Sequence, residues 1–245
     1  MIITVLTSLY NASQHLPNFM EDILQQTYFN QCQWFLLDAA SPENEYSIIQ
    51  PYLTKYPNIR YERLDNDPGI YACWNYMIRN SDSLYLTNAN VDDRMFPTCI
   101  EEHVEELNKS LYTDVVYCYN ATVTQPNLTY KDIQNHIMNN HVNIFPTSEY
   151  SLNALLECNL PHNHPLWRRS LHDKFGYFNE DYQSGSDWDF FLRCGVGNVG
   201  MKLIPKVLGI YYKNPEGMST KKENMKRNLE EVYIIKNKYR QLIHE

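Results

Sequence analysis

The sequence contains little glycine and no excess of basic residues. Only 8 of its 245 residues are glycine, and its formal net charge at pH 7 is −8. General nucleic-acid binding depends on a basic surface that neutralises phosphates. The charge balance therefore argues against a nucleic-acid partner.

The sequence also lacks closely spaced cysteine pairs. No CxxC motif occurs among its six cysteines, which are Cys32, Cys73, Cys99, Cys118, Cys158 and Cys194. This spacing indicates neither a zinc site nor a disulfide framework. We therefore expect free, buried thiols, as in proteins of a reducing compartment.

A long apolar run is missing as well. No stretch approaches the roughly 20 apolar residues that span a bilayer. The opening segment MIITVLTSLY has no basic start and soon turns polar, which is typical of a strand and not of a signal peptide. The sequence therefore predicts a cytoplasmic protein without a transmembrane segment, which would meet a membrane only at its surface.

The first half of the chain alternates between short apolar runs and amphipathic segments. Strands are expected at residues 2–7, 33–38, 58–64 and 83–90. Helices are expected at residues 16–24, 43–55 and 69–80. Such alternation predicts a parallel sheet with helices on both faces.

The second half is less regular. We expect a strand at 114–123, a short helix at 152–157, a turn leading into a helix at 164–176, and one or two strands, interrupted at Pro205, in 201–213. Residues 124–150 are polar and show no clear period. From residue 220 onward the pattern predicts a helix with a capping box at Thr220 and Glu223. Its expected apolar stripe consists of Met225, Leu229, Val232, Ile235, Tyr239 and Leu242.

Acidic and amide side chains follow the predicted strands. Ligands of open α/β sheets bind outside the carboxyl ends of the strands. The residues at these ends are Asp38, Asp65, Asp67, Asn90, Asp92 and Asp93. A single acidic turn commonly satisfies backbone amides. Several carboxylates on one rim favour a Mg²⁺ or Mn²⁺ site, because these ions prefer oxygen ligands.

Five segments occur in a distinctive order. They are ITVLTSLYN (3–11), LLDAAS (36–41), NDPGIYACWN (66–75), YLTNANVDDR (85–94) and the segment 164–193, which ends in GSDWDFFLR. This order resembles the inverting, nucleotide-sugar-dependent glycosyltransferases of family 2. The resemblance covers roughly residues 2–215, and no single segment would carry it alone.

The resemblance implies an α/β fold of the GT-A type, Rossmann-like, with a mainly parallel sheet flanked by helices, a C-terminal acceptor-side subregion and a terminal helix. One glycosyltransferase domain would span residues 1–219. Its nucleotide-sugar half would be 1–95 and its acceptor-side half 96–219. Residues 220–245 would form the amphipathic C-terminal helix.

The resemblance also implies an activity. The chain would move a sugar from a nucleoside diphosphate-sugar, with UDP-sugars favoured, to a hydroxyl of a glycan or lipid-linked acceptor with inversion. Polysaccharide or glycoconjugate biosynthesis would be its setting. Asn90, Asp92 and Asp93 would hold Mn²⁺ or Mg²⁺, although Asn90 stands where the family's metal motif has its first aspartate. The residues expected to contact substrate or nucleotide are Thr7, Tyr10, Asp38, Ser41, Asp67, Gly69, Tyr71, Asn75, His164, Trp167 and Trp188.

Asp187 would be the catalytic base by the same resemblance. It begins a predicted helix, and a rigid element would fix the carboxylate as a general base requires. We expect Trp188 to anchor this helix and Asp189 to pair with Arg193 on the solvent side. A purely structural role is also possible, because aspartate stabilises a first helical turn.

Three features of the sequence each admit two interpretations. His162 and His164 form a His-x-His pair that could bind a metal, but turn or cleft positions are commoner. Trp167 would either stack on a sugar or fill the core. The C-terminal helix carries lysines and arginines that suit an anionic membrane. Its apolar stripe would otherwise dock on the domain or on a partner, including a second copy of the chain.

Two functions compete with sugar transfer. A catalytically silent relative that binds a sugar nucleotide or glycan is supported by Asn90, while the retained Asp187 and Asp92 argue against it. A nucleotidyltransferase would also use metal-binding carboxylates. Such enzymes usually carry a glycine-rich basic loop, and the segment TSLYNAS contains neither glycine nor lysine.

Overall fold

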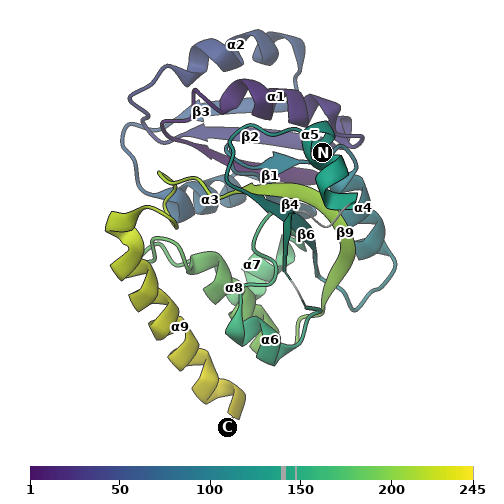
Figure 1. Ribbon diagram of the computed structural model, residues 1–245, viewed down its shortest axis with the longest axis vertical. Helices are drawn as coiled ribbons and strands as arrows, with labels where there is room; N and C mark the ends of the chain where they lie inside the picture. The colour runs from purple at the N-terminus through teal and green to yellow at the C-terminus, as the bar shows by residue number, and fades with distance from the viewer. Residues whose placement is uncertain (139–141, 147, 245) are drawn as a thin grey trace.

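A computed structural model describes residues 1–138, 142–146 and 148–244 of the protein (Figure 1). The strands are β1 (Ile3–Leu9), β2 (Cys32–Asp38), β3 (Ile59–Arg63), β4 (Tyr85–Asn88), β5 (Arg94–Met95), β6 (Val115–Val123), β7 (Asn143–Phe145), β8 (Leu166–Arg168) and β9 (Met201–Tyr212). They form one sheet in the order β3-β2-β1-β4-β8-β6-β9-β5, and β7 pairs with β6.

The four strands of the first half are parallel neighbours. β1 pairs with β2 and β4, and β2 pairs with β3. Successive side chains alternate between the faces, so that Leu6 and Leu37 enter one core while Val5 and Leu36 enter the other. The predicted α/β sheet is therefore confirmed, and the loops after β1, β2, β3 and β4 share one edge.

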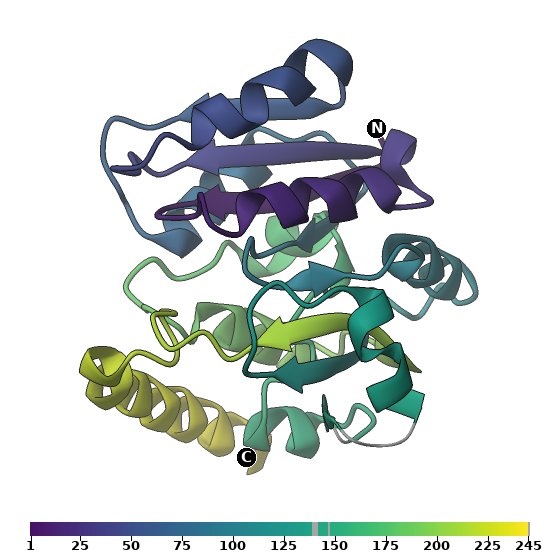
Figure 2. The ribbon, with the colours of Figure 1, turned by 45° about the horizontal axis from the view of Figure 1, so that its top comes forward.

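Helices cover both faces of the sheet (Figure 2). One core contains side chains from α1 (Leu16–Gln25), α2 (Glu45–Lys55) and α4 (Cys99–Asn108). The opposite core contains side chains from α3 (Ile70–Arg79), α6 (Leu152–Glu157), α7 (Ser170–Phe175), α8 (Ser186–Val196) and α9 (Met225–His244). A small third cluster lies beneath α5 (Tyr130–Met138).

The second half of the sheet is mixed. β8 lies antiparallel between β4 and β6, and β9 runs parallel to β6. The segment around Pro205 is one strand, not two. Ile204 pairs with Cys118 and Val207 with Tyr119, so Pro205 and Lys206 form an irregularity in the pairing. Such a bulge accommodates proline because proline lacks the N–H that a regular strand uses.

Four elements of this half were not expected, the first of which is α4. α5 and β7 lie within 124–150, where the sequence shows no period, and β8 lies within the segment predicted as a turn before a helix. β8 has only three residues, and its pairing with β4 and β6 makes it a strand. Residues 139–141 and 147 of the polar region lie outside the described residues.

The C-terminal helix differs in detail from its prediction. α9 begins at Met225 after a 3₁₀ turn, and the Thr220 hydroxyl donates to the carbonyl of Gly217 at 3.2 Å instead of capping the helix. Of the expected apolar stripe only Ile235 and Tyr239 are buried. They lie in the same core as α8, so the helix docks on the domain (Figure 1). The exposed members are Met225, Leu229, Val232 and Leu242.

No helix in the described part of the chain combines the length and the apolar character that a bilayer crossing needs.

Candidate active site

Loops after three parallel strands form what we call the strand-end edge: Tyr10 and Asn11 after β1, 38–41 after β2, and 90–93 after β4. Asp38 is fully buried there. Its Oδ1 accepts a hydrogen bond from Ser41 N at 2.8 Å, and its Oδ2 accepts one from the Tyr61 hydroxyl at 2.7 Å. The Arg63 guanidinium, half exposed, forms an ion pair with the same carboxylate. These contacts therefore fix the Asp38 carboxylate, and Arg63 balances its negative charge.

The turns after β1 and β2 are tied together. Ser41 Oγ accepts a hydrogen bond from Asn11 N at 3.0 Å and donates one to Glu45 at 2.6 Å. Asn11 has a φ of 50° and Ala40 a φ of 55°, both in the left-handed region, which makes the turns tight. Beside them the Tyr10 side chain is 50% exposed. The edge thus presents a cation and an aromatic face on a fixed backbone.

The residues expected to contact substrate include eight that are buried: Thr7, Asp38, Ser41, Tyr71, Asn75, His164, Trp167 and Trp188. Trp167 donates through Nε1 to His172, and Trp188 donates to the carbonyl of Leu155. The Asn75 amide pairs with the backbone of Phe178. Thr7 is fully buried too. These side chains contact protein groups in the structure and so stabilise the elements around the candidate site.

Asp67 and Gly69 form the start of α3. The exposed Asp67 carboxylate accepts a hydrogen bond from Gly69 N at 2.8 Å. Gly69 has a φ of 90°, a conformation that other residues adopt at a cost. Both residues therefore shape the loop that leads into α3.

The cluster after β4 contains the candidate metal ligands. The Asn90 amide donates to Asp93 Oδ2 at 3.1 Å, and Tyr212 N donates to Asp93 Oδ1 at 2.9 Å. Both oxygens of the buried Asp93 are thus occupied within the protein. Asp92 is half-buried, and one of its oxygens accepts a hydrogen bond from Asn214 at 2.9 Å. Asp93 therefore orients the Asn90 side-chain amide. The side-chain oxygen of Asn90 and the carboxylate of Asp92 are then the candidate metal ligands.

These two oxygen ligands fit a hard divalent cation. Burial, and next the charge of Asp92, raise the pKa of Asp93 well above its usual value. Among the residues that the structure describes, no lysine or arginine forms an ion pair with either carboxylate. A cation would offset this repulsion. Mg²⁺ and Mn²⁺ often use one or two protein carboxylates and complete their shell with water and phosphate.

Asp187 lies in the first turn of α8. Its Oδ1 accepts a hydrogen bond from the Tyr71 hydroxyl at 3.0 Å, and its Oδ2 accepts one from the Asn159 amide at 2.7 Å. We call these three residues the Asp187 cluster. Burial raises the pKa of Asp187, and the two donors oppose the shift. The residue as a whole is half-buried, so one side remains accessible.

A cavity of about 190 Å³ adjoins the Asp187 cluster at Tyr71. Its lining comes from the start of α3, the loop before α8 and the region around α9: Pro68, Gly69, Ile70, Tyr71, Ala72, Glu180, Tyr182, Gln183, Met218 and Arg227. Of the Asp187 cluster, Tyr71 is the member that lines this cavity.

Asp189 lies two residues further along α8 in a different environment. The predicted pair with Arg193 exists at 3.1 Å, but Asp189 is buried and not on the solvent side. Its other oxygen accepts from Lys238 at 2.7 Å and from the Tyr239 hydroxyl at 2.9 Å. Asp189 therefore joins α8 to α9.

Glu231 on α9 makes a second link, which no pattern in the sequence indicates. Its buried carboxylate accepts hydrogen bonds from the backbone N–H groups of Gln183 at 2.6 Å, Ser184 at 2.9 Å and Gly185 at 3.2 Å. These residues immediately precede α8. Glu231 thus fixes the start of the helix that carries Asp187.

The two histidines of PHNHP face different partners. His164 is buried beside the Asn88 carbonyl, with Nδ1 at 3.4 Å, whereas the His162 ring contacts Phe145 and Tyr211. Both have positive φ values. Burial lowers the pKa of each to about 4, so both are neutral. This arrangement favours the turn interpretation over a shared metal.

Comparison with known proteins decides the family. The model of glycosyl transferase family 2 matches residues 4–175. The chain belongs to this family. The chain is 25% identical over 122 residues to a glycosyltransferase of Mycoplasma pneumoniae, the MG025 homolog, a match that covers 48% of this chain and 40% of the relative. It is 24% identical over 216 residues to YwdF of Bacillus subtilis, covering 86% of this chain and 74% of the relative.

Solved structures confirm the GT-A fold of the glycosyltransferase. Staphylococcus aureus TarS 1–349 in complex with UDP-GlcNAc superposes with a TM-score of 0.74 at 16% identity, covering 96% of this chain and 65% of TarS. The mannosyltransferase PcManGT of Pyrobaculum calidifontis, in complex with GDP-Man and Mn²⁺, gives a TM-score of 0.70 at 14% identity, covering 95% and 63%. The glycosyltransferase thus spans less than two thirds of each.

Proposed function

We propose that this family 2 enzyme transfers a sugar from a nucleoside diphosphate-sugar to an acceptor hydroxyl with inversion, in polysaccharide or glycoconjugate assembly. Residues 1–95 would bind the donor and residues 96–219 the acceptor. The observation that carries the proposal is the Asp187 cluster: a half-buried carboxylate with a raised pKa, held by two donors next to a cavity.

Asp187 would act as the general base. It would take the proton of the acceptor hydroxyl while that oxygen forms a bond to the anomeric carbon. The bond from this carbon to the diphosphate oxygen breaks in the same step, so the configuration inverts and the diphosphate leaves. A raised pKa suits this role, because a base works best when its pKa lies near the operating pH. Tyr71 and Asn159 would hold the carboxylate in position.

A divalent cation at Asn90 and Asp92 would stabilise the negative charge of the departing diphosphate as a Lewis acid. The chain's own task there is to fix two oxygen ligands. Asp93 and Asn214 perform it through their hydrogen bonds to Asn90 and Asp92. Support for this choice comes from the Mn²⁺ complex of PcManGT, which shares the fold.

The strand-end edge would bind the nucleotide. Asp38 and Ser41 would hold the turn against which the base or ribose rests, and Tyr10 would stack on the base. Arg63 would add a positive charge at the same edge. A UDP-sugar is the favoured donor, by analogy with TarS, whose solved structures include complexes with UDP and with UDP-GlcNAc.

A panel of UDP-, GDP- and dTDP-sugars with Mn²⁺ tests the proposal through release of nucleoside diphosphate. One donor should be consumed in the presence of a glycan or lipid-linked acceptor, and NMR of the product should show the inverted anomeric configuration. Retained configuration would contradict the role of Asp187 as a base. Tight donor binding without any turnover would instead support a catalytically silent relative.

A further inference from the structure

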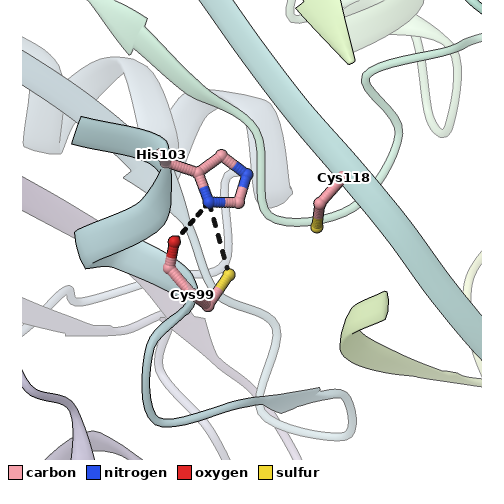
Figure 3. A group of neighbouring side chains, drawn as sticks. All are labelled: Cys99, His103 and Cys118. Carbon is pink, nitrogen blue, oxygen red and sulfur yellow. Dashed lines mark hydrogen bonds between the residues drawn. The ribbon is translucent and has the colours of Figure 1, made fainter. Parts of the chain in front are cut away.

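Three potential metal ligands meet in the core away from the residues assigned to catalysis. Cys99 and His103 lie one turn apart on α4, and Cys118 comes from the neighbouring strand β6 (Figure 3). One ligand atom from each residue lies within 4.8 Å of the other two. All three side chains are buried, with exposed fractions of 1% each. The i, i+4 spacing places Cys99 and His103 on one helix face.

The hydrogen bonds of His103 prepare its ring for a metal. Nδ1 is bonded to the carbonyl oxygen of Cys99, one turn earlier. This bond places the ring proton on Nδ1 and leaves a lone pair on Nε2, a common arrangement of metal-bound histidines. Nε2 is buried and has no hydrogen-bond partner among the described residues. Figure 3 shows Nε2 on the side of the ring toward Cys118.

The two thiols differ in their electrostatics. Burial raises the pKa of Cys118, but the Cys99 thiol and the His103 imidazole outweigh it and lower the value to about 6. Burial raises the pKa of Cys99 well above its usual range. Zinc binds the thiolate form of cysteine, so binding would remove the protons of both thiols.

We propose that Cys99, His103 and Cys118 form a structural zinc site, separate from the oxygen ligands at Asn90 and Asp92. Zinc bonds of about 2.3 Å to sulfur and about 2.0 Å to nitrogen put ligand atoms roughly 3.5–3.8 Å apart in a tetrahedron. One ring nitrogen of His103 and the two sulfur atoms already lie within 4.8 Å of one another. Small side-chain rotations would therefore bring them into range.

Charge balance favours zinc over a monovalent soft ion. The zinc complex would contain two thiolates, a neutral imidazole and a dication, and the protons of the two cysteines would leave to solvent. Its buried net charge is zero, which limits the cost of desolvation. Cu⁺ with the same ligands would leave a buried negative charge.

Zinc here would tie α4 to the central strand β6. Three protein ligands leave one tetrahedral position. His164 is a candidate for this position. Its buried Nε2 has no partner in the described ranges, and the ring lies near enough to His103 for their charges to interact. The sequence carries no CxxC signal for the site, because its ligands come from a helix and a strand that only the fold brings together.

Cobalt titration of the metal-free, reduced protein tests the site. A Co²⁺ ion bound by thiolates gives a sulfur-to-metal charge-transfer absorption that the oxygen ligands at Asn90 and Asp92 do not produce. We expect saturation at about one Co²⁺ per chain and displacement by Zn²⁺. Zinc should also raise the Tm of the wild type, because a ligand that binds the folded state stabilises it.

Two variants and one control complete the test. C118S and H103Q should lose the thiolate absorption and the zinc-dependent rise in Tm. C32S should keep both, because Cys32 is a fully buried thiol of the same core outside the cluster. Absence of the absorption in the wild type at excess Co²⁺ would overturn the proposal even if the variants fail to fold.

Discussion

At the strand-end edge each polar side chain directly follows its own strand, whereas the Asp187 cluster is gathered from three distant segments. Asp38 and the residues at 90–93 lie at or just after the ends of β2 and β4. Tyr71 lies 116 residues from Asp187 along the chain, and Asn159 lies 28 residues away. The edge depends on parallel strands that end together. The cluster depends on how α3, α6 and α8 pack.

The largest expected effect is a loss of transfer rate when the Asp187 cluster is changed. D187N should fold normally and bind donor, because the nucleotide edge is separate. Transfer should fall by roughly 10²–10⁴-fold, the usual contribution of a general base. Acceptor-dependent turnover measures the rate, and calorimetry measures donor binding.

The matched control for D187N is D173N on the neighbouring helix α7. Asp173 is exposed and should tolerate the same charge change. Asp189 is unsuitable, although it lies on α8, because it is buried against Lys238 and Tyr239. Equal rates for D187N and D173N would remove Asp187 from the mechanism.

At the strand-end edge, D92A should lower turnover by about 10²-fold, the cost of losing one preorganised electrostatic contact. Chelation should have a similar effect, and Mn²⁺ or Mg²⁺ should restore the wild type only. D65A, which removes an exposed carboxylate after β3, is the control. Full activity of the wild type in chelator would show that the Asn90 site works without a metal.

A smaller effect is expected for D38A. The variant should weaken nucleotide binding by about 1–3 kcal/mol, because the Ser41 amide and the Tyr61 hydroxyl lose their acceptor. Calorimetry with UDP measures the change. Unchanged affinity in a folded variant would place the nucleotide elsewhere.

The smallest effect on turnover should come from E231Q, because Glu231 only positions the start of α8. Glu231 accepts three backbone hydrogen bonds before α8, so the variant should lose about 1–3 kcal/mol of stability. Its kcat should fall less than that of D187N, with the donor KM unchanged. E230Q changes an exposed glutamate of the same helix and should match the wild type. A lower donor affinity in E231Q would show that α9 serves the donor side instead.

The same comparison explains what the sequence could predict. Short apolar runs and the polar residues after them located β1 to β4 and the residues of the strand-end edge, because both signals are local. Asp187 was identified through the family's motif order, but its partner Asn159 had no signal, since only the packing of α6 against α8 brings them together. For Trp167 the sequence left stacking on a sugar and packing in the core open, because both roles favour an aromatic residue, and in the structure its side chain is buried.

The pH dependence of single-turnover transfer tests most directly whether Asp187 is the base. A base must be deprotonated, so the rate should fall as the pH drops through the pKa of Asp187, which burial raises above the ordinary 3.8. Tyr71 donates to the carboxylate and lowers its pKa, so Y71F should move this acidic limb to higher pH. D187N should lose the limb together with most of the rate. A wild-type rate that does not fall at acidic pH, or an unchanged limb in D187N, would contradict the account.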